Sequence, residues 1–137
     1  MSTRPIGDYA LLSDCRSAAL VSTAGSVDWL CLPRFDSPAV FGRLLDEEAG
    51  HWTIRPRGPS EVTRRYVPET LVLETTFRTA SGTMVLLDAL AMGHRERGHA
   101  LAASSPASCC ARSRAPADRW RWRPTSRHAR SSASSTR

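Results

Sequence analysis

Residues 71–90 read LVLETTFRTASGTMVLLDAL, a segment with two alternating halves around a turn of small residues. A β-strand places successive side chains on opposite faces, so the alternation over residues 71–79 predicts a strand. Ala80-Ser81-Gly82 is a turn signal, and a second strand is predicted over residues 83–90. The segment therefore predicts an antiparallel hairpin, and with it a fold rich in β-structure.

The residues before this hairpin also form short apolar runs separated by turn residues. Thr23-Ala24-Gly25-Ser26 contains a glycine that can adopt positive φ, and it joins two of the runs into another hairpin. The second of these runs is apolar on one face throughout and nearly so on the other, as expected of a strand covered on both sides. The strands predicted before residue 71 span residues 8–12, 18–22, 27–32, 51–54 and 62–67.

One stretch has the pattern of a helix instead. In Asp36-Ser37-Pro38, Ser37 is placed as the N-cap and Pro38 at the first helical position. Apolar residues follow at helical spacing, so we expect one short helix that ends near Asp46. The predicted fold class is mainly β: an incomplete antiparallel β-sandwich with one short helix.

Charge divides the chain into two parts. Residues 1–93 carry 9 arginines and 11 acidic residues, whereas residues 94–137 carry 10 arginines and 2 acidic residues. From residue 102 onward there is no Val, Ile, Leu, Met or Phe, so that segment lacks the side chains of a core. We expect a folded domain over residues 5–99 and a disordered tail rich in Arg, Ser and Ala over residues 100–137. The high pI therefore says nothing about the partners of the folded part.

No cofactor or metal motif is present, so neither a cofactor nor a metal is expected. Cys109-Cys110 with His99 and His128 lacks any zinc-ligand spacing. Cys15 and Cys31 stand among apolar residues and are expected to be buried, reduced thiols. The N-terminus has no signal-peptide layout, and no apolar run reaches membrane-spanning length. We therefore expect a cytoplasmic location and no membrane contact.

Two longer stretches resemble a known enzyme family. PIGDYALLSDCRSAALVSTAGSVDWLCLPRFDSPAVFGRLLDEEAGHW (residues 5–52) and RRYVPETLVLETTFRTASGTMVLLDAL (residues 64–90) closely resemble the N-terminal domain of bacterial glycoside hydrolase family 15, the glucoamylase- and trehalase-like enzymes. The resemblance covers residues 5–99 and implies a sandwich of the supersandwich kind, followed in those enzymes by an (α/α)6 barrel.

The same resemblance implies hydrolysis of α-glucosidic bonds with inversion. In that reaction one carboxylic acid protonates the leaving oxygen and a second carboxylate activates water on the other side of the sugar. Both groups belong to the family's barrel, and no stretch of this chain matches their motifs. The barrel is expected to be absent here, so no catalytic residue is expected in this chain.

Three residues around the end of the strand at residues 27–32 are candidates for substrate binding. Trp29, Arg34 and Asp36 combine an aromatic face, a forked donor and an acid, which suit a ligand rich in hydroxyl groups. The structural alternative, which we favour, places Trp29 in the core and pairs Arg34 with Asp36. In that interpretation Asp36 also supports the start of the helix.

Other carboxylates stand out as possible acids or bases. Asp14, Asp28 and Glu74, like Asp36, fall at turns, caps or strand faces. Acidic side chains in such places commonly bind their own backbone, so a structural role is the better prediction for each of them.

The tail can also be read in a shifted codon frame. If the frame slips near Pro106, the third base of each codon joins the first two of the next. The Cys109-Cys110 pair then encodes leucine, residues 119–123 (RWRWR) permit an alternating strand, and residues 127–137 permit P-R-P-E-F-G-L-V-H-P, which is similar to the family's continuation. The resulting hypothesis is a chain that is correct through residue 106 and out of frame afterwards.

Three functional hypotheses follow. The first is a non-catalytic N-terminal fragment of a family 15 hydrolase, inactive alone, that meets an α-glucoside only through the missing barrel. The second is a small β domain whose tail, with Trp120 and Trp122 among arginines, binds nucleic acid non-specifically; no specific nucleic-acid partner is expected. The third is a sandwich that binds carbohydrate by itself. The oligomeric state is left open.

Overall fold

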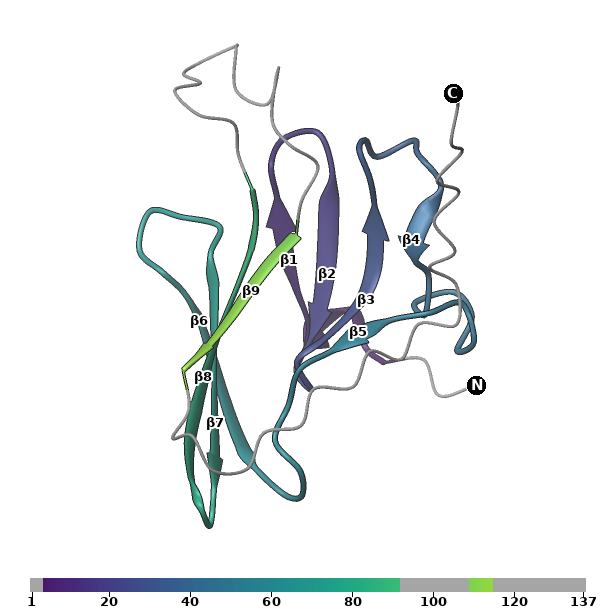
Figure 1. Ribbon diagram of the computed structural model, residues 1–137. Coiled ribbons are helices and arrows are strands. Elements are labelled where there is room, and N and C mark those ends of the chain that lie inside the picture. The colour runs from purple at the N-terminus through teal and green to yellow at the C-terminus, as the bar shows by residue number, and fades with distance from the viewer. Residues whose placement is uncertain (1–3, 92–108, 115–137) are drawn as a thin grey trace, which may run out of the picture.

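Two antiparallel sheets pack against each other in the computed structural model, which describes residues 4–91 and the backbone of residues 109–114 (Figure 1). One sheet has five strands in the order β1-β2-β3-β4, with β5 paired to β3. The other has four strands in the order β6-β7-β8-β9. The protein is therefore mainly β, as predicted.

Seven of the described strands, all except β4 and β9, match predicted strands, with each boundary within about two residues of its expected place. The first sheet contains β1 (Tyr9–Ser13), β2 (Ala18–Ser22), β3 (Ser26–Cys31), β4 (Ala39–Phe41) and β5 (Trp52–Thr53). The second contains β6 (Glu61–Tyr66), β7 (Leu73–Thr79), β8 (Gly82–Leu90) and β9 (Cys109–Arg114). A single turn of 3₁₀-helix, η1 (Ile6–Asp8), precedes β1.

The hairpin at residues 71–90 is confirmed, since β7 pairs with β8 in a register that runs from Leu73 opposite Asp88 to Thr79 opposite Gly82. Alternate residues of both strands are buried, as a sheet with one covered face requires. The earlier hairpin is also confirmed, because β2 and β3 pair on either side of the predicted turn.

The core lies between the sheets and takes side chains from both. Leu12, Val21 and Leu30 of the first sheet form one buried cluster with Leu73 and Leu90 of the second. A smaller cluster, made by Phe77, Met84 and Leu86, continues the core along β7 and β8. Apolar burial of this kind is the main stabilising contribution to the fold.

A β-bulge in β3 sets which of its side chains reach that core. Val27 lies opposite Val21 and Trp29 lies opposite Leu20, so Asp28 is an extra residue without a partner in the ladder. The bulge lets both Val27 and Leu30 join the core cluster. The side chain of Asp28 is consequently directed to hydrogen-bonding partners of its own, described below.

The predicted helix near residues 37–46 is wrong. Residues Ala39–Phe41 form strand β4, in which Phe41 lies opposite Leu30. The hydroxyl of Ser37 accepts a hydrogen bond from the backbone N–H of Arg34 at 3.1 Å, behind it in sequence. It therefore does not cap a following helix, and the open edge of β3 offers these residues a backbone partner that local sequence does not reveal.

Two other expectations differ from the structure. Cys31 is buried as predicted, but Cys15 is exposed, because it lies in the tight β1–β2 turn with a φ of 69°. The tail was expected to be disordered from residue 100, whereas Cys109–Arg114 form β9 beside β8. Backbone pairing explains the second difference, since a strand edge can accept any extended segment. The other tail residues lie outside the described ranges.

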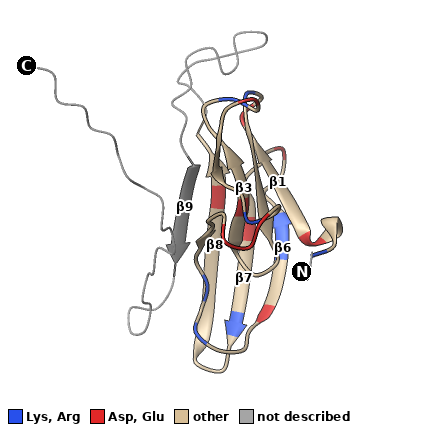
Figure 2. Ribbon diagram, turned by 90° about the vertical axis from the view of Figure 1, so that its right-hand side faces the viewer, with Lys and Arg blue, Asp and Glu red and all other residues tan. Residues whose placement is uncertain are grey.

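Two side chains of β6 tie the sheets together at the β1 edge. The guanidinium of Arg64 donates to the carbonyl oxygens of Asp8 at 3.0 Å and Val21 at 3.3 Å. The hydroxyl of Tyr66 accepts from the N–H of Leu11 at 2.9 Å and donates to its carbonyl at 3.0 Å. Basic residues of β6 are drawn in blue in Figure 2, on the strand that faces this edge.

Candidate functional site

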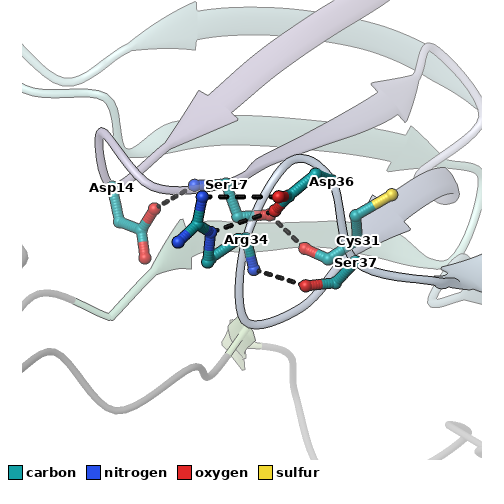
Figure 3. Close-up of polar contacts among 6 residues, drawn as sticks. All are labelled: Asp14, Ser17, Cys31, Arg34, Asp36 and Ser37. Carbon is teal, nitrogen blue, oxygen red and sulfur yellow. Dashed lines mark hydrogen bonds and ion pairs between the residues drawn. The ribbon is translucent and has the colours of Figure 1, made fainter.

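Arg34 and Asp36, two of the predicted candidates, form an ion pair in the loop between β3 and β4. The Arg34 Nε lies 3.0 Å from Asp36 Oδ1, and Nη2 lies 3.3 Å from Oδ2 (Figure 3). Both side chains are exposed, at 63% and 72% of their surface. The structure therefore brings these two residues together as the structural alternative predicted, although there is no helix for Asp36 to support.

This loop is held against the β1–β2 turn (Figure 3). The N–H of Phe35 donates to the carbonyl of Arg16 at 2.9 Å, and the hydroxyl of Ser17 donates to the carbonyl of Cys31. The buried Asp14 accepts from the N–H of Ser17 at 2.7 Å, which is the turn role predicted for it.

Trp29 lies apart from that loop. It is half-buried and lies opposite Leu20. Val27 and Leu30 belong to the buried core cluster, whereas Trp29 does not. The prediction that Trp29 is a core residue is therefore wrong. No hydrogen bond links it to Arg34 or Asp36 among the described residues, and a sugar-binding role for the three residues stays a prediction.

Asp28 is a buried carboxylate with three side-chain partners among the described residues. Its side chain is 1% exposed and accepts hydrogen bonds from the hydroxyl of Tyr9 at 3.1 Å and from the hydroxyl of Ser26. The Nε of Arg43 lies 3.7 Å from Oδ1. Ser26 in turn accepts from the hydroxyl of Thr53 at 2.9 Å, so the network joins β1, β3, β5 and the β4–β5 loop. Buried carboxylates need such partners to offset the loss of water.

A cleft of about 990 Å³ opens beside this network. Its walls come from the N-terminal segment before β1 and from the β4–β5 loop, and its lining includes Arg4, Arg43 and His51. Its five carboxylates are those of Asp8, Asp28, Asp46, Glu47 and Glu48. Two guanidinium groups face five carboxylates, so the lining has a net negative charge.

Burial shapes the titration of two cleft residues. It raises the pKa of the Tyr9 hydroxyl, and the nearby Asp28 carboxylate raises it further. Burial also lowers the pKa of His51, and the Arg43 guanidinium adds to that effect. The lowered pKa favours the neutral imidazole of His51, so the charged groups of the lining are mainly its guanidinium and carboxylate groups.

Asp28 carried the signal of this site in the sequence, because it is an acid within the otherwise apolar run Val27–Leu32. The sequence predicts a structural role for Asp28 but does not reveal two of its partners, Arg43 and Tyr9, which are 15 and 19 residues away in the chain. Glu74, the remaining candidate acid, accepts from Arg65 at 2.7 Å across the β6–β7 pair. The predicted nucleic-acid residues Trp120 and Trp122 lie outside the described ranges.

Within residues 4–91, no cluster of three His, Cys, Asp or Glu side chains is arranged to hold a metal ion. In the same part of the chain no helix is long and apolar enough to cross a membrane.

The fold and the cleft define a class of protein: a two-sheet antiparallel β domain whose polar network fixes loops beside an acidic cleft. More particularly, the chain belongs to the trehalase-like N-terminal domain family, which matches residues 1–109. It is 54% identical over 90 residues to a trehalase of Mycolicibacterium smegmatis, 53% identical over 90 residues to a trehalase of Mycobacterium tuberculosis, and 39% identical over 97 residues to trehalase 1 of Sulfolobus acidocaldarius.

These alignments cover 65%, 65% and 69% of this chain but only 14%, 13% and 16% of the relatives. The chain thus spans about one seventh of the length of the curated relatives it matches. No solved structure matches it.

Proposed function

We propose that this chain is the non-catalytic N-terminal part of a glycoside hydrolase of family 15, whose complete form hydrolyses an α-glucosidic bond with inversion. The observation that carries the proposal is the match of residues 1–109 to the trehalase-like N-terminal family, together with relatives named trehalase that are about seven times longer than the aligned segment. The substrate of the complete protein is accordingly proposed to be trehalose or a related α-glucoside, bound outside this chain.

The environments of the candidate acids support a non-catalytic role. Inverting hydrolysis needs a protonated acid and an ionised base on opposite sides of one sugar. Here Asp28 is held by Tyr9, Ser26 and Arg43, and Asp36 is paired with Arg34. These contacts position backbone and loops, so we expect no turnover by the chain alone.

A complementation assay tests this proposal. The 137-residue chain is mixed with M. smegmatis trehalase from which the 90 matching residues have been removed, and glucose release from trehalose is measured. We expect no activity from the chain alone and a gain of activity on mixing. Turnover by the chain alone, or no gain on mixing under conditions where the intact M. smegmatis enzyme is active, would contradict it.

The predicted sugar role of Arg34 can be examined in the same assay. Since its ion pair with Asp36 is exposed, Arg34→Ala should cost little stability. Normal activity of the mixture with Arg34→Ala would end the functional interpretation of this residue, whereas a raised KM without loss of binding would support it.

We further propose that the reading frame is shifted after about residue 106. The family match extends to residue 109, and the residues beyond it lack the apolar side chains of a core. The nucleotide sequence around codons 100–112 tests the idea. If neither deleting two bases nor adding one opens a continuous family-like frame, the proposal fails.

A further inference from the structure

The most exposed large apolar side chains of the described residues gather beside the acidic cleft. Ile6 is 86% exposed and Leu45 is 75% exposed, more than any other large apolar residue of the described ranges. Leu45 lines the cleft directly. Ile6 is not itself a lining residue, but it belongs to the segment whose Pro5 and Asp8 line the opposite wall. A strongly exposed leucine in the lining of the cleft, with an exposed isoleucine in the segment that forms the opposite wall, indicates an interaction surface.

The loop that displays Leu45 has a fixed conformation. The N–H of Leu44 donates to the carbonyl of Asp28 at 3.0 Å, and the N–H of Leu45 donates to the carbonyl of Gly42 at 2.9 Å. Farther along, the N–H of Ala49 donates to the carbonyl of Asp46 at 2.9 Å. The β4–β5 loop is therefore attached to the buried Asp28 network. Because the loop is already ordered, binding of a partner there loses little conformational entropy.

The negative charge of the cleft lining favours a positively charged occupant. Asp28 and Arg43 already neutralise each other, which leaves Arg4 against the carboxylates of Asp8, Asp46, Glu47 and Glu48. An occupant with Lys or Arg groups would complement this lining, while an acidic one would be repelled.

We propose that the cleft docks a basic segment of the same parent polypeptide, from the part beyond the residues matched here. An apolar side chain of that segment contacts Leu45 and Ile6, and its cationic groups face Glu47 and Glu48. The proposal rests on the proposed function, because the chain spans only about 14% of its M. smegmatis relative and the remainder needs a surface to pack on. Interfaces between domains of one chain are typically mixed polar and apolar, as this cleft is.

The test uses the full 137-residue chain and the M. smegmatis trehalase without its 90 matching residues, with binding measured by calorimetry. Leu45→Asp should weaken binding at least about tenfold, because it places a charge at the centre of an apolar contact. The matched control is Leu71→Asp, on a 48% exposed leucine just before β7, which should change affinity less than about twofold. Circular dichroism of each variant confirms that it folds like the wild type.

Charge reversal provides an independent readout. Glu47→Arg combined with Glu48→Arg should weaken binding, and the wild-type affinity should fall as salt is raised. Equal binding by the wild type and Leu45→Asp would overturn the docking site while leaving the proposed function intact. No binding by the wild type at all would contradict both. Leu45-dependent self-association in sedimentation, or binding of maltooligosaccharide that Leu45→Asp abolishes, would overturn the choice of occupant.

Discussion

The hydroxyl of Tyr9 donates a hydrogen bond to Oδ2 of Asp28, at 3.1 Å, across the first sheet. Tyr9 begins β1 and Asp28 is the bulged residue of β3, so the bond crosses over β2, which lies between them. Arg43, from the β4–β5 loop, approaches the other carboxylate oxygen at 3.7 Å. One buried side chain thus fixes both walls of the acidic cleft.

Asp28→Asn should destabilise the chain by about 1–3 kcal/mol. The amide keeps the shape of the carboxylate but removes the charge that faces Arg43, and one of its two polar ends cannot accept the bonds that Asp28 accepts. Urea unfolding at pH 7 measures the loss. The control is Asp36→Asn, whose exposed ion pair should contribute less than about 1 kcal/mol. Equal losses in the two variants would show that the network does not hold the cleft.

Gly25→Ala should be among the most damaging single changes outside the core clusters. Gly25 has a φ of +69°, and a Cβ there would lie 2.7 Å from the carbonyl oxygen of Ile54 and 2.8 Å from Cζ of the buried Phe77. Backbone strain and overpacking together should cost more than about 2 kcal/mol. Gly58→Ala is the control, because it has a φ of +89° with nothing within 4 Å and should lose only about 1 kcal/mol. Similar unfolding midpoints for the two variants would contradict the close approach.

Tyr66→Phe should leave the backbone N–H and carbonyl of Leu11, at the edge of β1, without their hydrogen-bond partner. The Tyr66 hydroxyl pairs with both the N–H and the carbonyl of Leu11, and these groups would otherwise be an unpaired part of a sheet edge. Loss of both bonds should cost about 1 kcal/mol and increase aggregation on warming, measured by light scattering. A variant as stable and as resistant to aggregation as the wild type would show that water replaces the hydroxyl without consequence.

The sequence predicts local elements well here and long-range partners poorly. The alternation on either side of residues 80–82 requires a hairpin whatever the rest of the chain does. The segment Ala39–Phe41 fits a helix or a strand equally by spacing, and the outcome depends on the edge of β3, which no local pattern records. Asp28 likewise stands out in the sequence as an acid in an apolar run, but the cleft beside it cannot be predicted, because its other walls come from distant segments. The family resemblance identified the domain, but it did not predict these side-chain contacts.

Asp88 gives the domain a predicted dependence on pH. It is 3% exposed, its Oδ2 has no hydrogen-bond partner among the described residues, and burial raises the pKa of its carboxyl from 3.8 to about 7. Between about pH 4 and pH 7 the unfolded chain has released this proton while the folded chain keeps it, so the contribution of Asp88 to stability falls as pH rises and levels off above about pH 7. Asp88→Asn cannot ionise and should remove this decline.

Urea unfolding of the wild type and Asp88→Asn at pH 4.0, 5.5 and 8.0 tests this dependence. The two proteins should differ by less than about 1 kcal/mol at pH 4, and the variant should be more stable by an amount on the order of 2–4 kcal/mol at pH 8. The difference between the two proteins isolates Asp88 from every other titrating group. A difference that stays constant from pH 4 to pH 8 would mean that Asp88 is ionised in the folded domain, with a partner that stabilises its charge.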